Sequence, residues 1–226
     1  LAFLTFSSGA HSQALFESHE ILPVTIEGPL TTFQKERSDV DYLDGQFSYT
    51  DEVGETKTFD LKFRARGRYR RQAKTCSFPP VRLNFRKGQV DGSLLDGQDK
   101  LKLVTHCKSR DSYEQYLQRE YLAYRILQVL TEKSFSPRLL RITYVDTESD
   151  AEPIIKYGFV IEDADDVGKR NSLNELDIKS LTYGQLDAQH SNLINVYQYL
   201  IGNTDFSLIR GPDDDNCCHN SVPFSA

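Results

Sequence analysis

The chain has 226 residues, of which 38% are hydrophobic and 27% are charged, and its formal net charge is −6. These values are typical of an ordinary globular protein with one large or two small domains. The net negative charge argues against nucleic acid as the partner of the whole chain, and no apolar run is long enough to cross a bilayer.

The first twelve residues predict the remnant of a secretory signal peptide. An apolar stretch is followed by small residues, with a plausible cleavage site at Ala10-His11-Ser12. An apolar first strand is the alternative. The chain contains no methionine, and 222–226 carries no helix-closing signal. We therefore interpret the sequence as a fragment of a longer protein exported to the periplasm or the extracellular space.

The segment from Ile21 to Thr105 predicts a β-rich region. Apolar and polar residues alternate in short runs separated by Gly, Asp or Pro, which is the period of strands with one buried face. These runs are 22–26, 45–50, 58–66, 81–85 and 100–105.

The period then changes to that of a helix over 111–133, with Ser112 and Gln115 at the spacing of a capping box. A strand pair follows at 139–145 and 154–161, and then an acidic connector at 162–166. After a loop-rich stretch comes an apolar helix at 192–201, which Gly202 ends.

This order of elements predicts an α+β fold. We expect three parts after one another in the chain. They are the signal-peptide remnant 1–12, a β-rich N-terminal lobe over 13–161 that carries the helix 111–133, and a connector with the beginning of a helical C-terminal lobe over 162–226.

Two of the four cysteines flank neighbouring predicted strands. Cys76 precedes the run 81–85 and Cys107 follows the run 100–105, so an antiparallel hairpin would bring them together as a disulfide. Cys217 and Cys218 are adjacent and cannot easily bridge each other without strain, so we expect their partners beyond this fragment.

Asp205 is the first candidate functional residue. It follows the helix 192–201 at the edge of a core, where a carboxylate is costly unless it has a role. An Asp with a downstream Asn, here Asn220, positions a nucleophile and a metal in phosphoryl-transfer enzymes. The alternative is a helix end with a solvated turn.

Arginines at period two form the second candidate. Arg64, Arg66, Arg68 and Arg70 surround Gly67 and would share one face of a strand and its turn. Guanidinium binds phosphate through paired hydrogen bonds, and Gly67 lets the turn approach a ligand closely. The alternative is a solvated face that protects a sheet edge.

Lys102 and Glu120 form the third candidate. Lys102 lies in mid-strand between apolar neighbours, and Glu120 lies among apolar and aromatic positions of the helix 111–133. A Lys102–Glu120 pair would compensate both charges, whereas the alternative leaves Glu120 at a wet boundary. The acidic run 213–215 could add a carboxylate to a divalent-cation site.

The ordered motifs resemble the spore-coat protein H (CotH) kinase-like family over roughly Phe59 to Asn220. The motifs are a basic turn at 66–71, a Pro-preceded strand at 81–85, the lysine strand, the helix with Glu120, the hairpin from Ser136 and the run Gly158-Phe-Val-Ile-Glu-Asp. The resemblance implies a divergent protein-kinase-like fold, with an antiparallel β-rich N-terminal lobe and the start of a helical C-terminal lobe.

The resemblance also implies a nucleotide site for ATP. Arg66, Gly67 and Arg68 would belong to the loop that covers the phosphates, although the family usually has a Gly-Asn-Ser type sequence there. Lys102 would be the nucleotide lysine and Glu120 its helix partner. The connector Phe159 to Asp163, with Glu162, would lie against the adenine.

For the chemistry, the resemblance implies Asp205 as the catalytic residue that orients the acceptor hydroxyl and Asn220 as a ligand of Mg²⁺. The metal-binding Asp that the family has after this Asn is not in the chain. We therefore expect the fragment itself to be inactive.

The sequence thus predicts an exported phosphotransferase that moves the γ-phosphoryl of ATP, with Mg²⁺, to a hydroxyl of a protein or small molecule. The alternative is a non-catalytic exported envelope or binding module whose arginine-rich face binds an anionic polymer. The acceptor and the oligomeric state stay open.

Overall fold

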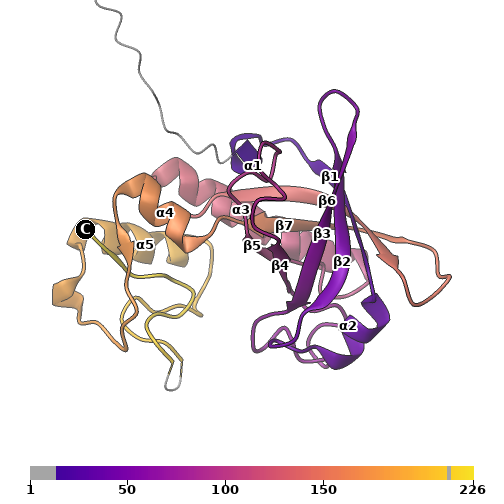
Figure 1. Ribbon diagram of the computed structural model, residues 1–226. Helices are drawn as coiled ribbons and strands as arrows, with labels where there is room; N and C mark the ends of the chain where they lie inside the picture. Colours follow the sequence, from indigo (N-terminus) through magenta and orange to yellow (C-terminus); the bar gives the residue numbers. More distant parts are fainter. Residues whose placement is uncertain (1–13, 213–214) are drawn as a thin grey trace, which may run out of the picture. The chain divides into compact units, whose positions relative to one another are not determined.

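The computed structural model describes residues 14–212 and 215–226, and the predicted signal-peptide remnant lies outside them. The chain divides into two compact units (Figure 1). The barrel unit contains the described residues up to Tyr121 together with Pro137–Ile161, and the helical unit contains Leu122–Ser136 and Glu162–Ala226. Each unit is described by itself below.

The barrel unit is built on seven strands. In sheet order β1-β2-β3-β4-β5-β7-β6 they form a closed barrel (Figure 1). The strands are β1 (Leu22–Gly28), β2 (Leu43–Thr50), β3 (Thr56–Ala65), β4 (Val81–Phe85), β5 (Lys100–Val104), β6 (Pro137–Asp146) and β7 (Ile154–Ile161).

The barrel is closed by a parallel pair. β1 pairs antiparallel with β2 on one side and parallel with β6 on the other, where Val24 lies opposite Ile142 and Thr25 opposite Thr143. The predicted kinase-like fold is therefore wrong, because its antiparallel lobe has no place for this closure. Local sequence patterns do not predict the pairing of strands more than a hundred residues apart, because alternation specifies which face of a strand is buried and not which strand it pairs with.

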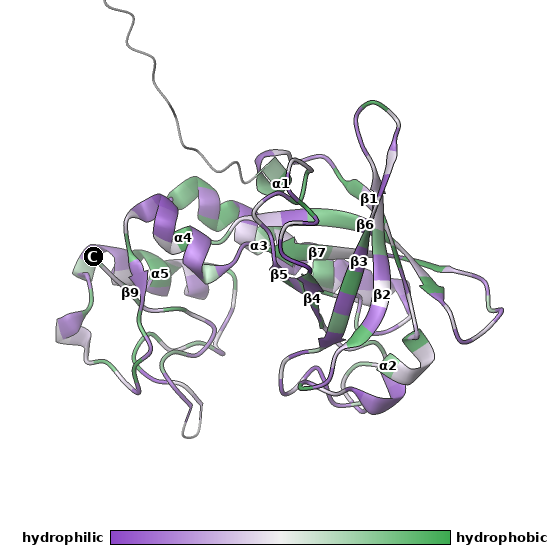
Figure 2. Cartoon of the chain, viewed as in Figure 1, coloured by the Kyte–Doolittle hydropathy of each residue, from purple (hydrophilic) through white to green (hydrophobic). Residues whose placement is uncertain are grey.

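The barrel interior is filled by the apolar face of every strand. Leu83 and Leu103 have no exposed surface, and Leu61 and Leu140 have 1%. The alternation that predicted the strands is visible along β2 and β3 (Figure 2). Burial of these side chains stabilises the barrel by about 1.5–3 kcal/mol for each large residue.

Helix α2 (Leu30–Glu36) contributes Phe33 to the same core. The ring of Phe33 lies 5.4 Å from the rings of Phe63 and Phe78. The side chain of Asp146 at the end of β6 accepts a hydrogen bond from the Leu30 amide at 2.9 Å, which fixes the start of the helix. The short helix α1 (Ala14–Glu17) adds Leu15 and Phe16 to this core.

The predicted disulfide between Cys76 and Cys107 is confirmed, with the two Cα atoms 4.5 Å apart. Phe78 forms an isolated antiparallel bridge with Cys107, and β4 and β5 pair antiparallel as expected. The bond ties the loop between β3 and β4, residues 66–80, to the segment that follows β5, and we call this loop the arginine loop.

Helix α3 (Asp111–Leu130) begins and ends close to its predicted bounds, with Ser112 inside it rather than before it. Its first half packs on the outside of the barrel. Tyr121 meets Phe159 edge to face at 5.9 Å, and Glu114 binds Lys156 of β7 at 3.1 Å. These contacts explain why the end of β7 is buried on both faces.

Among the described residues, the helical unit contains the second half of α3 and five further elements. Where the sequence predicted an acidic connector and loops, α4 (Ala164–Asn171) forms instead, with the Asp163 side chain accepting from the Asp165 amide. The others are β8 (Asn174–Glu175), the 3₁₀ turn η1 (Tyr183–Gln185), α5 (Ala188–Leu200) and β9 (Phe224–Ser225).

Two further findings concern the described residues of the chain. Cys217 and Cys218 are bonded to each other across a cis peptide, so the expectation that they find partners elsewhere is wrong. Within residues 14–212 and 215–226, no helix is long and apolar enough to span a bilayer.

His106 is a polar residue in the barrel interior. It has 4% exposed surface, and its ring lies 5.1 Å from Phe78 and 5.8 Å from Tyr144. Its Nδ1 and the Tyr144 hydroxyl are both buried without a hydrogen-bond partner. Burial, assisted by the charge of Lys156, lowers the pKa of His106 from 6.5 to about 4. Burial also raises the pKa of Tyr144.

The first prediction tests the packing between β1 and β2. A Cβ on Gly45 would lie 2.4 Å from the Glu27 carbonyl oxygen and 2.9 Å from the Phe63 ring. We expect Gly45→Ala to lower the free energy of unfolding by about 2–4 kcal/mol in urea denaturation, through strain between packed strands. Gly184→Ala, where the added methyl meets nothing within 4 Å, is the control. Equal stability of the two variants would contradict the packing.

The second prediction concerns acid. The unfolded chain protonates His106 near pH 6.5 but the folded chain only near pH 4, so stability conferred by the neutral ring is complete above 6.5 and falls as the pH drops towards 4. The total loss is about 3 kcal/mol. His106→Phe should remove this part of the pH dependence of unfolding while carboxylate titration remains. Identical pH slopes in both proteins would show that His106 is not buried as described.

Candidate functional site

The segment that follows α5 carries Asp205. The helix ends at Leu200, and Gly202, at φ +68°, turns the chain out of it. Asn203 then stabilises the turn. Its backbone amide donates to the Gln198 backbone carbonyl at 2.9 Å, and its side-chain oxygen accepts from the Asp205 backbone amide at 3.0 Å. The backbone around Asp205 is therefore fixed by its own neighbours.

A two-stranded bridge brings the distant part of the site to Asp205. Ser207 and His219 exchange both backbone hydrogen bonds, at 2.9 and 3.1 Å. The Ser221 hydroxyl adds a bond to the Ser207 carbonyl at 2.8 Å. This antiparallel register places the residues just before Ser207 beside those just after His219, so residues fifteen positions apart become neighbours.

The structure brings together the two residues that the sequence singled out. Asn220 donates through Nδ2 to the Asp205 backbone carbonyl and lies 3.5 Å from Asp205 Oδ2. Asn220 adopts φ +50°, a left-handed conformation that Asn tolerates better than most residues. Since its amide nitrogen faces Asp205, its amide oxygen is the group left for another ligand.

His219 completes this cluster, although it was not among the predicted site residues. Its Nε2 lies 2.8 Å from Asp205 Oδ1, a contact in which Nε2 donates when it carries the proton. The Asp205 side chain is 81% exposed and that of His219 31%. We call Asp205, His219 and Asn220 the Asp205 cluster. It combines an accessible carboxylate, an imidazole and an amide, which suits proton transfer at an exposed hydroxyl.

The arginines do not form the predicted period-two face. β3 ends at Ala65, so only Arg64 lies in the strand, where its guanidinium is 5.0 Å from the centre of the Tyr42 ring. Arg66, Gly67, Arg68 and Arg70 lie in the arginine loop, with Gly67 at φ +80°. The predicted face required a strand conformation, in which alternate side chains point the same way, and residues 66–70 form a loop instead.

Arg70 is the cation that meets Glu120. Its guanidinium lies 3.2 Å from Glu120 Oε2 and donates to the Thr105 carbonyl at 3.0 Å. The Glu120 side chain is 41% exposed, which fits the alternative of a wet boundary, and its ion pair is with Arg70 and not with Lys102. Lys102 lies half-buried on β5, opposite Arg82 of β4 and Ile161 of β7.

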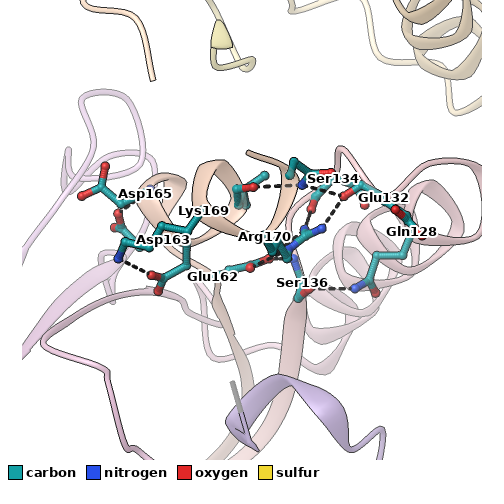
Figure 3. A network of polar contacts seen from close by, with 12 residues as sticks. Gln128, Glu132, Ser134, Ser136, Glu162, Asp163, Asp165, Lys169 and Arg170 are labelled. Carbon is teal, nitrogen blue, oxygen red and sulfur yellow. Dashed lines mark hydrogen bonds and ion pairs between the residues drawn. The ribbon is translucent and has the colours of Figure 1, made fainter. Parts of the chain in front are cut away.

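Glu162 is the centre of a polar network in the helical unit (Figure 3). It has no exposed surface. Arg170 of α4 lies 2.9 Å from its Oε1 and 3.1 Å from its Oε2, and the Ser136 amide donates to Oε2 at 2.9 Å. Arg170 and Ser136 thus hold both carboxylate oxygens inside the helical unit.

Arg170 carries this network to the end of α3. Its guanidinium also donates to the backbone carbonyls of Glu132 and Ser134, and Gln128 donates to the Ser136 hydroxyl at 3.0 Å (Figure 3). One partly buried ion pair therefore fixes the turn after α3 and helix α4 together. Sequence reasoning missed Arg170 because the segment was predicted as loop; an acidic first turn followed by a basic last turn is the signal that could have found the helix.

The described acidic residues outside the Asp205 cluster do not gather into a metal site. Asp213 and Asp214 lie outside the described residues. Among the residues that the structure describes, no three His, Cys, Asp or Glu side chains gather closely enough to hold a metal ion. A cation at the Asp205 cluster would need oxygens from a ligand.

Comparison with protein-family models, with curated proteins and with solved structures returned no match for this chain.

The third prediction tests the Glu162 network. Glu162→Gln keeps the shape of the side chain but leaves the Arg170 charge without its carboxylate, which should lower the stability of the helical unit by about 2–4 kcal/mol. Asp166→Asn on α4 is the control, since it breaks the surface pair with Lys169 and should change the stability by less than about 1 kcal/mol. Urea denaturation followed by far-UV circular dichroism measures both. Equal losses would contradict the structural role of Glu162.

Proposed function

We propose that this chain belongs to an exported phosphotransferase that moves the γ-phosphoryl of ATP, with Mg²⁺, to a hydroxyl of a protein or small molecule. The observation that carries the proposal is the contact of Asn220 with Asp205 across fifteen residues of sequence. The paired Asp and Asn suit an acceptor hydroxyl and a metal bound to phosphates.

Asp205 acts as the base in this proposal. Its carboxylate is exposed, so an acceptor hydroxyl can reach Oδ2 and donate its proton as the oxygen attacks. His219 holds Oδ1 at 2.8 Å, which restrains the rotation of the carboxylate. Orientation of the acceptor by such a fixed group is a large part of catalysis in phosphoryl transfer.

The residues present fit Mg²⁺ in part. Hard cations prefer oxygen ligands, and the amide oxygen of Asn220 is turned away from Asp205, where it can meet an ion carried by the phosphates. When bound, Mg²⁺ neutralises charge on the transferring phosphoryl group. Arg66, Gly67, Arg68, Lys102 and Glu120 belong to the barrel unit, and the resemblance alone supports their part in nucleotide binding.

Export is part of the proposal. The apolar N-terminal stretch supports it, and so does the Cys76–Cys107 disulfide, because such bonds persist in oxidising compartments.

The fourth prediction tests the proposal on the full-length mature protein. Lys102→Ala should weaken binding of Mg²⁺–ATP at least about tenfold, whereas Asp205→Asn should leave that affinity within about threefold and lower phosphoryl transfer about 10²–10⁴-fold. Asp165→Asn, an exposed carboxylate on α4, is the control and should change neither.

Nucleotide binding by calorimetry and transfer of labelled phosphate to a panel of hydroxyl acceptors measure the two effects. Binding of Mg²⁺–ATP that Lys102→Ala leaves unchanged would refute the nucleotide site. Failure of the mature protein to bind nucleotide at all would favour the non-catalytic module instead.

A further inference from the structure

The barrel unit has a hollow of about 400 Å³ between the end of α2 and the arginine loop. Its wall includes three arginines, Arg37, Arg68 and Arg71, and one carboxylate, Glu36. Gln72 and Ala73 complete the lining. Arg37 follows the last residue of α2 and was not singled out by the sequence pattern.

Two of these arginines hold each other in place. Arg37 donates to the Arg71 carbonyl at 3.1 Å, and Arg71 donates to the Arg37 carbonyl at 3.1 Å. Arg37 also donates to the carbonyls of Cys76 and Ser77, at 2.9 and 2.7 Å. Since Cys76 is bonded to Cys107 on the barrel, the guanidinium of Arg37 is anchored to a cross-linked part of the fold.

The charge of Arg37 is not balanced by a carboxylate among its described contacts, because all three of its bonds go to neutral carbonyl oxygens. Partial burial lowers the pKa of its guanidinium. Arg71 pairs with Asp39 at 2.9 Å and donates to the Gly67 carbonyl at 3.0 Å.

Both guanidiniums keep hydrogen-bonding capacity for a ligand. Arginine has five N–H donors, and the described contacts of Arg37 and of Arg71 each use three of them. Donors that are held in place by the protein lose little entropy on binding, which is the advantage of a preorganised site. Planar guanidinium forks match the oxygens of a phosphoryl group.

We propose that this hollow is a binding site for a phosphoryl group, with Arg37 and Arg71 as its fixed donors and Arg68 at its rim. The site lies wholly within the barrel unit and does not depend on phosphoryl transfer at Asp205. It differs from the period-two arginine face that the sequence predicted, because Arg64 lies over Tyr42 and Arg70 is paired with Glu120.

The fifth prediction uses inorganic pyrophosphate as the probe, titrated into the whole chain without Mg²⁺ at low ionic strength. Arg37→Gln and Arg68→Gln should each weaken binding at least about tenfold by removing a charge-assisted contact. Glu36→Gln should tighten it about two- to fivefold, because a carboxylate beside the ligand is removed. This gain cannot arise from misfolding.

Arg141→Gln is the matched control, since Arg141 is an exposed arginine on β6 that does not line the hollow, and it should change the affinity less than twofold. Arg37 has no part in the proposed nucleotide site, so a loss of binding in Arg37→Gln separates the hollow from that site. Long-chain polyphosphate, titrated in parallel, distinguishes a polymeric source of the phosphoryl group from a small molecule, and binding of either through Arg37 supports the site.

Two results would overturn the proposal. They are no measurable binding of either probe, and an unchanged affinity in Glu36→Gln with losses in the arginine variants no larger than in Arg141→Gln.

Discussion

The barrel unit depends on the parallel pairing of β1 with β6. Every other neighbouring pair of strands in the sheet is antiparallel, and this one pair turns an open sheet into a closed barrel. Closure removes the edges on which unpaired amide and carbonyl groups would be exposed. It also encloses the apolar face of each strand inside the barrel, so that Leu83, Leu103 and Ile142 have no surface exposed to water. The positions of α2, the arginine loop and the first half of α3 follow from this closed surface.

The fold and the candidate sites are linked through cross-links between segments distant in the sequence. The Cys76–Cys107 disulfide fixes the end of the arginine loop to the barrel, and Arg37 then fixes that loop to α2. In the helical unit, Glu162 and Arg170 fix α4 to the turn after α3. The Ser207–His219 bridge does the same for the Asp205 cluster. In each case a few directional contacts position groups that the main core does not reach.

Local patterns predicted much of the barrel unit. The runs 81–85 and 154–161 are strands with those bounds, because alternation and flanking turns specify a strand wherever one face is buried. The disulfide followed from the same hairpin. The closure by β1 and β6 was not predicted, because the pairing of strands that a long segment separates depends on the whole sheet. The prediction of a kinase-like fold was wrong for this reason.

The sites were predicted less completely. Asp205 and Asn220 were identified as a pair, and the structure brings them into contact, although their catalytic role stays a prediction. His219, Arg37 and Arg170 were missed since their importance comes from where long side chains reach and not from their neighbours in sequence. For Glu120, the need for a cation was predicted, and the identity of that cation was not.

The closure of the barrel is tested most directly by nuclear Overhauser effects between methyl-labelled threonines. Thr25 of β1 and Thr143 of β6 are register partners in the parallel pair. We predict a strong contact between their methyl groups, together with contacts between Ile26 and Phe47 across β1 and β2. Contacts between β1 and β2 without any between Thr25 and Thr143 would show an open sheet and contradict the barrel.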